Sequence, residues 1–276
     1  MDRKAEKILS SGIYGLSYNP FGKEAGLRPT TFQSNDFREA AKRLNFIKDA
    51  RGIGLFTAPP GFGKTYSLRC FAETLNPNLY QMAYICLTTV SVTEFYRQFC
   101  AALSLECSIH KSTMFRAIQE RLYVLFKEKR RPFILAVDEA HDLDARALKD
   151  IKMIMNHAYD SLNCFSLLLV GEPHLNHILA KPIHEALLQR ITVHYNFVGL
   201  SSDETLKYIN HKITEAGGCP SILADGVAGA VHGFSNGNPR IIDNVMSDAL
   251  DIGAQFAKPV IDTDIILSAV ENQSFQ

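Results

Sequence analysis

A glycine-bearing loop between a short apolar run and a helical pattern is the feature that most restricts the fold of this chain. The apolar run begins at Ile53, and the helical pattern begins at Lys64. Between them the sequence reads Ala58-Pro59-Pro60-Gly61-Phe62-Gly63. A strand that leads through such a loop into a helix N-terminus presents backbone N–H groups and a positive helix dipole to phosphate oxygens. The segment therefore predicts a phosphate-binding loop in an α/β domain.

The side chains of this loop divide into phosphate and metal ligands. Lys64 is expected to reach the β- and γ-phosphates of ATP, and the hydroxyl of Thr65 is expected to bind Mg²⁺. Ala58 stands where the pattern G-x-x-x-x-G-K-[ST] has its first glycine, which is acceptable if its backbone is not left-handed. The predicted nucleotide-binding residues of the loop are Pro59, Pro60, Gly61, Phe62, Gly63, Lys64, Thr65 and Tyr66.

Two carboxylates follow the apolar run that ends at Val137. Asp138 is expected to bind the nucleotide and to join Thr65 in holding Mg²⁺, while Glu139 orients and polarises the attacking water. A hydrophobic run before Asp-Glu is a weak signal alone, and it becomes a specific one downstream of a phosphate loop. The two motifs together predict ATP hydrolysis with ATP and Mg²⁺ as cofactors.

Three further polar residues are candidates for the same site. Glu172 follows an apolar run that ends at Gly171, where a polar side chain usually senses the γ-phosphate; a structural hydrogen bond is the alternative. A carboxylate there repels phosphate unless it binds a metal, a basic side chain or water. Arg190 precedes the last strand-like run and Arg240 opens a later helix, as expected for an arginine finger acting in trans and a lid sensor. The alternative for both arginines is an ordinary surface salt bridge.

Strand-like and helical patterns alternate through the first two thirds of the chain. Such alternation predicts an α/β domain with a central parallel sheet whose strands are buried on both faces. The expected strands are Ile53–Ala58, Met82–Thr88, Pro132–Asp138, Cys164–Gly171 and Thr192–Phe197. The expected helices between them are Phe37–Asp49, Lys64–Leu75, Val92–Leu103, Thr113–Lys129 and Ala145–Tyr159.

After Ser201 only helical patterns remain, which predicts a small all-helical lid domain. Its expected helices are Asp203–Ala216, Ser221–His232, Pro239–Ile252 and Asp262–Val270. The expected organisation is an irregular N-terminal segment at residues 1–35, an ATPase core at 36–198 and the lid at 199–276.

Six motifs in a fixed order resemble a known family. They are Tyr14-Gly15-Leu16 with Asn19-Pro20-Phe21, the phosphate loop, Val137-Asp138-Glu139-Ala140-His141, Leu169-Val170-Gly171-Glu172-Pro173, Gln189-Arg190-Ile191 and Gly237-Asn238-Pro239-Arg240. The set resembles AAA+ ATPases of the ExeA type, close to the TniB- and TnsC-like transposition regulators, over roughly residues 12 to 270.

This resemblance implies an AAA+ P-loop NTPase fold and an ATP-dependent homo-oligomer, either a ring or a helical filament. Lys64, Thr65, Asp138 and Glu139 would act in cis, Arg190 would reach into the neighbouring subunit, and Arg240 would lie in the lid. The chain departs from the family at Ala58 and at Glu172, where the family usually has Gln, Thr or Asn. Either departure could slow hydrolysis, so that the nucleotide acts more as a switch than as a fuel.

The expected role is an ATP-dependent, DNA-binding regulator of transposition. Secretion-type members of the family carry a membrane span, and here no apolar stretch reaches the ~18 residues that a span needs. The expected partners are double-stranded DNA, a transposase and target-selector proteins, without a membrane. The candidate DNA-binding residues are Lys111, Thr113 and Lys149. The alternatives are a plain helix with Ser112 as N-cap and a solvated charged face.

Two other functions stay open: an ATPase that energises an envelope or secretion assembly complex, and a nucleotide-gated switch of the STAND or initiator type. Lys plus Arg and Asp plus Glu are both 29, so no general basic field favours nucleic acid. Six cysteines without a C-x-x-C pair indicate reduced thiols in a cytoplasmic protein. His174, His177 and His184 lie close in sequence, but without further ligands they do not predict zinc.

Overall fold

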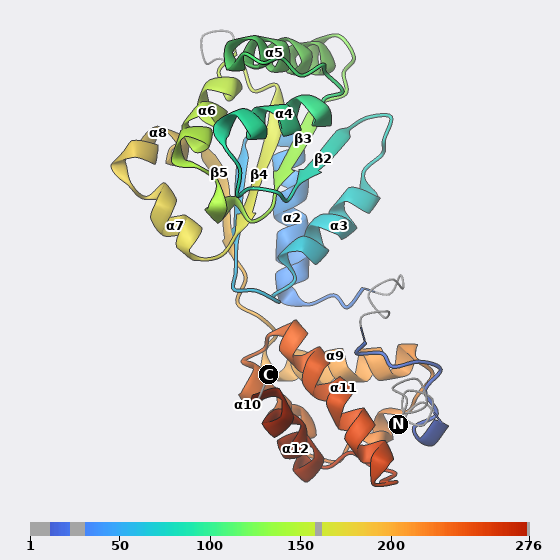
Figure 1. Cartoon of the computed structure of the whole chain (residues 1–276). Coiled ribbons are helices and arrows are strands. Elements are labelled where there is room, and N and C mark those ends of the chain that lie inside the picture. Colours follow the sequence, from blue (N-terminus) through green and yellow to red (C-terminus); the bar gives the residue numbers. More distant parts are fainter. Residues whose placement is uncertain (1–11, 23–30, 158–161, 275–276) are drawn as a thin grey trace. The chain divides into compact units, whose positions relative to one another are not determined.

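The computed structural model describes residues 12–22, 31–157 and 162–274, which form two compact units (Figure 1). The first unit spans Phe37 to Phe197. The second combines the described residues up to Asp36 with the chain from Val198 onward. Each unit has its own hydrophobic core and is described by itself.

The first unit is built on a sheet of five parallel strands. They are β1 (Ile53–Thr57), β2 (Gln81–Ile85), β3 (Phe133–Val137), β4 (Phe165–Gly171) and β5 (Ile191–Asn196). Their order across the sheet is β2-β3-β4-β1-β5, and every neighbouring pair is parallel. The predicted central parallel sheet is confirmed, and the carboxyl ends of β1, β3 and β4 meet at one edge.

Burial differs between central and edge strands. Every residue of β1, β3 and β4 is buried, as the continuous apolar runs predict. In β5, half-buried residues alternate with the exposed Thr192, His194 and Asn196. An edge strand has one neighbour and less cover from helices, so only one of its faces needs apolar side chains. The expectation of two buried faces is therefore wrong for β5 and for the other edge strand, β2, in which Ile85 is buried and Tyr84 is exposed.

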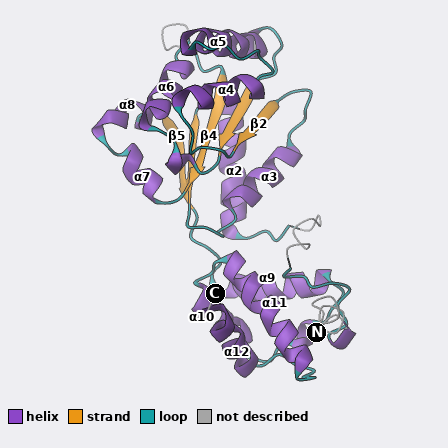
Figure 2. Cartoon of the chain, in the orientation of Figure 1, coloured by secondary structure: helices purple, strands orange, loops and turns teal. Residues whose placement is uncertain are grey.

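Helices cover both faces of this sheet (Figure 2). One face packs against α4, α5 and α6 through a cluster that includes Phe95, Phe99 and Phe165. The other packs against α2 and α3 through Leu44 and Phe71. The helical elements are α2 (Asn35–Ala50), α3 (Lys64–Thr74), α4 (Val92–Ala102), α5 (Lys111–Lys127), η2 (Ala140–Asp142), α6 (Ala145–Met155), α7 (His174–Leu179), η3 (Pro182–His184) and α8 (Glu185–Leu188). The predicted end of the fifth helix, Tyr159, lies outside the described residues.

The second unit is helical after Val198. Its elements are α9 (Ser202–Glu215), η4 (Pro220–Ile222), α10 (Val227–Ser235), α11 (Pro239–Gln255) and α12 (Thr263–Ser274). The helix predicted at Ser221–His232 starts later, at Val227, because Leu223 is extended and forms a parallel bridge with Ile261. None of the helices in the described ranges is long and apolar enough to cross a bilayer.

The N-terminal motif packs into the core of this helical unit. Tyr14, Leu16 and Phe21 are buried in one cluster with side chains of α9, α10 and α11. The Tyr14 hydroxyl donates to the backbone oxygen of Lys258 at 3.0 Å, and the Asn19 amide donates to Ser247 Oγ at 2.8 Å. Residues 12–22, which the sequence set apart as an irregular segment, are thus part of the packing of the helical unit.

Candidate nucleotide-binding site

The phosphate loop joins β1 to α3 through two left-handed glycines. Gly61 and Gly63 have φ values of 88° and 86°, a conformation that residues with a Cβ rarely adopt. Ala58 is buried and lies outside the left-handed region, and its N–H donates to Gly171 O at 3.2 Å. An alanine in place of the first glycine of the pattern is therefore compatible with this loop. Phe62 packs partly against the adjoining core.

Lys64, the first residue of α3, folds back over the loop. Its side-chain ammonium donates to the backbone oxygens of Ala58 at 2.7 Å and Pro59 at 3.2 Å, and the residue is 7% exposed. These contacts hold the ammonium of Lys64 over the loop backbone. Pro59 and Pro60 are exposed at the mouth of the loop, and Tyr66 lies in the first turn of α3.

Asp138 connects the loop to the end of β3. Its Oδ2 accepts a hydrogen bond from Thr65 Oγ1 at 2.7 Å, and its Oδ1 accepts one from the Glu139 N–H at 3.0 Å. Asp138 itself is 2% exposed, whereas its partner Thr65 is exposed. A hydroxyl beside a carboxylate is the oxygen set with which proteins bind Mg²⁺. Thr65 and Asp138 thus fit the magnesium ion that the loop implies.

Tyr84, a residue that sequence reasoning missed, contributes to the same cluster. Its hydroxyl donates to Asp138 Oδ2 at 2.8 Å, so one carboxylate oxygen accepts from both Thr65 and Tyr84. Burial raises the pKa of Tyr84, and the hydrogen bond to Asp138 raises it further. The sequence signal for this role is the position of Tyr84, one residue before the end of β2. Strand β2 pairs in parallel with β3, and Ile85 lies opposite Val137, the residue before Asp138.

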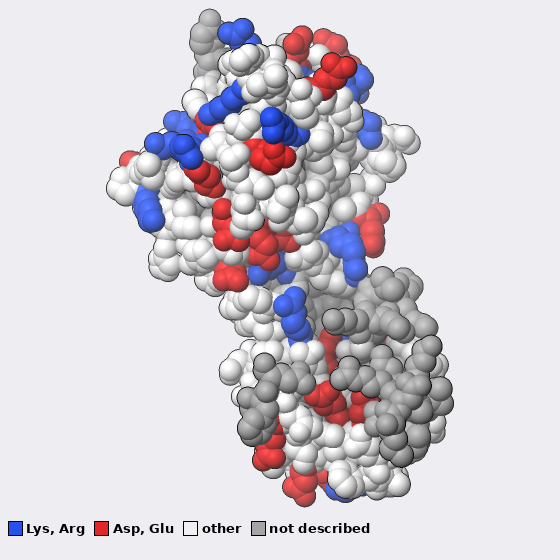
Figure 3. Space-filling view, in the orientation of Figure 1, with Lys and Arg blue, Asp and Glu red and all other residues white. Residues whose placement is uncertain are grey.

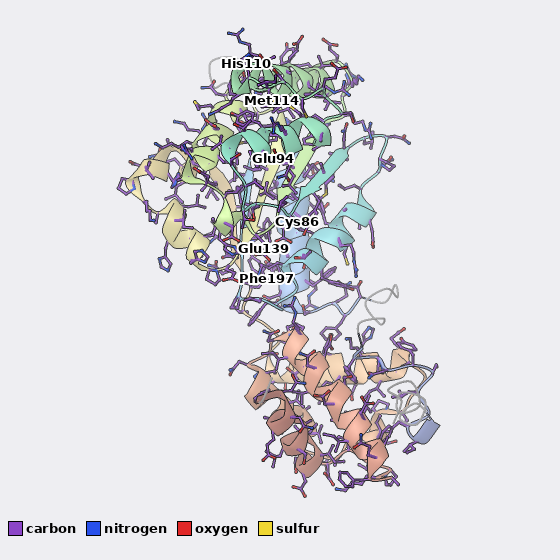
Figure 4. All side chains as sticks on the ribbon, in the orientation of Figure 1. Cys86, Glu94, His110, Met114, Glu139 and Phe197 are labelled. Atoms are coloured by element: carbon purple, nitrogen blue, oxygen red, sulfur yellow. The ribbon has the colours of Figure 1, made fainter. Side chains whose placement is uncertain are left out.

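Glu139 stands in a strained backbone conformation. Its φ and ψ are 51° and 38°, and left-handed non-glycine residues cost about 1–3 kcal/mol each and gather at functional sites. The turn directs the carboxylate away from the strand, where its side chain is 49% exposed and its Oε2 lies 3.5 Å from His141 Nδ1. Figure 4 shows Glu139 and Cys86 at the same end of the sheet.

Glu172 follows β4 and lies between two histidines. Its backbone N–H donates to His141 Nδ1 at 3.2 Å, and its Oε2 is 3.9 Å from His174 Nδ1. The hydrogen bond suggested by the sequence thus belongs to the backbone of Glu172. Among the described residues, no lysine or arginine forms an ion pair with its carboxylate.

The two candidate arginines lie in different units. Arg190 is half-buried in the turn between α8 and β5, where its backbone N–H donates to the backbone oxygen of Leu187 at 3.0 Å. Arg240 is exposed at the second position of α11. Its backbone N–H donates to Oδ1 of Asn238, the N-cap of that helix, at 3.0 Å.

The start of helix α5, which carries the candidates Lys111 and Thr113, lies at the end of the first unit away from Glu139. Figure 4 shows His110, which precedes Lys111, at the end of the unit opposite to Glu139. Helix α5 begins at Lys111 with His110 as N-cap, so the suggested N-cap Ser112 lies inside the helix together with Thr113. Lysine and arginine side chains are scattered over this part of the surface among acidic ones (Figure 3).

Lys111 is not a freely available cation. Its ammonium lies 2.5 Å from Oδ2 of Asp150, whose side chain is only 5% exposed, and 5.4 Å from the ring centre of Tyr96. Asp150 therefore neutralises much of the charge that a DNA phosphate would need. Lys149, the residue before Asp150 on α6, is exposed.

Comparison with known proteins agrees with this architecture. Residues 47–179 match the model of a family described as an AAA domain. The chain is 28% identical over 263 residues to General secretion pathway protein A of Aeromonas hydrophila, an alignment that covers 94% of this chain and 48% of that protein. The chain thus spans about half the length of this curated relative.

Several solved structures share the fold. Cdc6p from Pyrobaculum aerophilum has a TM-score of 0.65 at 14% identity, covering 87% of this chain and 68% of its own. The ORC1 protein of Aeropyrum pernix, solved in complex with DNA, has a TM-score of 0.64 at 15% identity, covering 92% and 68%. A RuvB variant from Thermotoga maritima has a TM-score of 0.58 at 18% identity, covering 89% and 72%. The strand order, the phosphate loop and these likenesses show the AAA+ P-loop fold with a helical C-terminal part.

Proposed function

We propose that this chain binds ATP with Mg²⁺ and hydrolyses it. The observation that carries the proposal is the convergence of Thr65 Oγ1 and Tyr84 Oη on Oδ2 of Asp138, next to a loop whose lysine is folded over it. Lys64 would bind the phosphates, and Thr65 and Asp138 would hold the metal ion. Glu139 would orient and deprotonate the attacking water, for which its exposed carboxylate is accessible.

The arginines extend the proposal to an assembly. Arg190 would reach the nucleotide of a neighbouring copy, and Arg240 would act from the helical lid, both on charge that develops at the γ-phosphate. An active site completed by a second copy makes hydrolysis depend on self-association. We therefore expect an ATP-dependent homo-oligomer, either a ring or a helical filament.

The first candidate for the biological role is an ATPase that energises an assembly complex of the cell envelope. Similarity to General secretion pathway protein A along 94% of the chain supports this role. In such a complex, the nucleotide state of this chain would drive changes in a partner that carries the envelope contacts.

The second candidate is an ATP-dependent regulator of transposition that binds double-stranded DNA and recruits a transposase or a target selector. The ordered motifs from Tyr14 to Arg240 support it through their resemblance to TniB- and TnsC-like ATPases. Lys149 and Thr113 are exposed and are the better phosphate contacts, since Lys111 is paired with Asp150.

Sedimentation velocity with ATP, ADP or no nucleotide, with and without duplex DNA, separates these roles. ATP-dependent assembly that DNA leaves unchanged supports the envelope role, whereas larger species that form only with ATP and DNA support the transposition role. ATP-driven assembly without measurable phosphate release would indicate a nucleotide-gated switch. A wild-type protein that behaves like Lys64→Ala in nucleotide titrations would refute the proposed ATPase.

A further inference from the structure

His141, Glu172 and His174 form a compact group beyond the carboxyl ends of β3 and β4. Each offers one ligand atom, and these atoms all lie within 4.8 Å of one another. We propose that the three side chains bind a divalent transition-metal ion of the zinc class. This site is separate from Thr65 and Asp138, and its existence does not depend on ATP hydrolysis.

The fold brings the three residues together from different elements. Strands β3 and β4 are adjacent and parallel, with Val137 opposite Leu169, so both chains leave the sheet at the same edge. The short helix η2 carries His141 beside the end of β4, and His174 is the first residue of α7. A Cβ added to Gly171 would lie 3.0 Å from His141 Nδ1, so the absence of a side chain at Gly171 permits this approach.

The contacts within the group leave its carboxylate available. His141 Nδ1 accepts the Glu172 N–H at 3.2 Å, and the two imidazole rings meet edge to face with centroids 4.6 Å apart. In the described part of the chain, the ionic contact of the Glu172 carboxylate is with His174 Nδ1 at 3.9 Å, which is longer than a hydrogen bond. A carboxylate directed toward an imidazole that it does not reach has unused capacity to bind a cation.

The donor set suits zinc better than magnesium. Two imidazoles and one carboxylate, with water in the fourth position, are a common ligand set for Zn²⁺, whereas Mg²⁺ favours oxygen ligands. Zinc bonds of about 2.1 Å in a tetrahedron place ligand atoms about 3.4 Å apart, so the group must close by at most about 1.4 Å. Glu172 and His174 are 38% and 51% exposed at their side chains and can move by this amount through rotamer changes.

Binding through His141 has one structural consequence. The nitrogen Nδ1 that accepts the Glu172 N–H cannot also bind a metal, and a neutral ring in this arrangement carries its proton on Nε2. The ion must therefore either replace the backbone hydrogen bond at Nδ1 or displace the proton of Nε2 after the ring turns.

A bound ion would also change the charge beside the phosphate loop. Gly171 pairs with Thr57 and accepts the Ala58 N–H, so Glu172 directly follows the residue that contacts the start of the loop. An ion at Glu172 neutralises a carboxylate that otherwise repels phosphate. This consequence rests on the proposed ATPase function, and it predicts tighter ATP binding when the site is filled.

The test uses the full chain, freed of metal by a chelator and studied without nucleotide. Titration with Co²⁺ should give the intense visible absorption of a tetrahedral complex, at one ion per chain, and Zn²⁺ should displace it. His174→Ala and Glu172→Gln should each weaken binding by at least about tenfold, because each removes a direct ligand. His177→Ala is the matched control, since His177 is exposed on the same helix and outside the group. Circular dichroism and thermal melting verify that each variant is folded.

Three outcomes would overturn the proposal. The first is a weak octahedral Co²⁺ spectrum in the wild type, and the second is equal affinity in wild type, His174→Ala and Glu172→Gln. The third is cobalt–thiolate charge-transfer absorption, which would assign the ion to the exposed Cys86, Cys107 or Cys219. Nucleotide titration with Mg²⁺, compared with Lys64→Ala, is measured separately, so a failed metal site and a failed ATPase give different results.

Discussion

Hydrogen bonds at both carboxylate oxygens fix the orientation of Asp138. Oδ2 accepts from Thr65 and Tyr84, and Oδ1 accepts from the backbone of Glu139. A buried carboxylate held in this way needs little rearrangement when a metal ion binds, because its direction is already set. The strained Glu139 next to it is held by the same contact, so the orientations of the metal ligand and the proposed base depend on each other.

Glu139→Gln should preserve nucleotide binding and slow hydrolysis by roughly 10²-fold or more, since the amide cannot accept the proton of the attacking water. Phosphate release measures turnover, and titration with a fluorescent nucleotide measures binding. Lys64→Ala is the reference for lost binding because it removes the ammonium that contacts the loop. Turnover close to that of the wild type would exclude Glu139 as the base.

Tyr84→Phe should raise the Mg²⁺ concentration required for half-maximal hydrolysis. The change removes one hydrogen bond to a charged group, worth about 1–2 kcal/mol after allowance for the partial exposure of Tyr84, or roughly 5- to 30-fold. Tyr123→Phe is the matched control, because Tyr123 is similarly exposed on α5. An unchanged Mg²⁺ dependence would show that Tyr84 does not orient Asp138 for the metal ion.

At the scale of elements, the N-terminal strap of residues 12–22 and helix α11 fit closely together. A Cβ added at Gly253 would lie 2.2 Å from the Tyr14 hydroxyl oxygen and 2.7 Å from Ile261 Cδ1. Neither neighbour has room to withdraw, since Tyr14 is 3% exposed and Ile261 is fully buried. The strap is therefore an integral part of the helical core.

Gly253→Ala should lower the free energy of unfolding of the helical unit by about 1–3 kcal/mol through overpacking. Gly233→Ala, on α10, meets no atom within 4 Å and should instead stabilise the helix by about 0.5–1 kcal/mol. Thermal or denaturant unfolding distinguishes the expected loss of stability in Gly253→Ala from the expected gain in Gly233→Ala. If both variants unfold like the wild type, the strap does not pack against α11 in solution.

The sequence predicted those elements in which one local signal dominates. Continuous apolar runs identified β1, β3 and β4, and the loop pattern set the start of α3 at Lys64. Contacts between distant residues were beyond such reasoning. The Leu223–Ile261 bridge delays α10, and Tyr14 reaches Lys258 across the chain. Neither pairing leaves a periodic trace in the sequence.

The candidate site shows the same difference between residues that a local motif predicts and residues that the fold brings together. Motif spacing predicted Lys64, Thr65, Asp138 and Glu139, whereas Tyr84 resembles any tyrosine in a strand until β2 is aligned with β3. The three histidines considered from sequence lie close along the chain, yet the structure combines only His174 with His141 and Glu172. Ligands from separate elements meet through the sheet, which a linear search does not reveal.

At the scale of the whole molecule, the sharing of active sites can be tested by mixing subunits. Arg190→Ala subunits should fold and bind ATP but be inactive as pure oligomers, since no copy supplies the finger. Mixing them with Lys64→Ala subunits should restore part of the activity, because some interfaces pair an intact loop with an intact Arg190. No recovery at any ratio, with mixed assembly verified by labelled subunits, would assign Arg190 a structural or cis role.

In the proposed transposition role, DNA binding would likewise be a property of the assembly. With 29 basic and 29 acidic side chains, one copy has no net field to attract a polyanion. Affinity must then arise when ATP-driven assembly aligns a few cations from many copies along the duplex. Binding should be cooperative, tolerant of sequence and strongly salt-dependent, since each neutralised phosphate releases counterions.

Lys149→Ala should therefore weaken ATP-dependent binding about uniformly across DNA sequences and reduce the slope of log affinity against log salt. Lys111→Ala should change this slope less, because Asp150 already neutralises that ammonium at 2.5 Å. Its thermal stability must be measured in parallel, since the variant leaves Asp150 buried without its cation. Fluorescence anisotropy over a salt series gives both slopes. If the wild type with ATP ignores duplex DNA even at low salt, the transposition role fails, and the envelope-assembly role becomes the one to pursue.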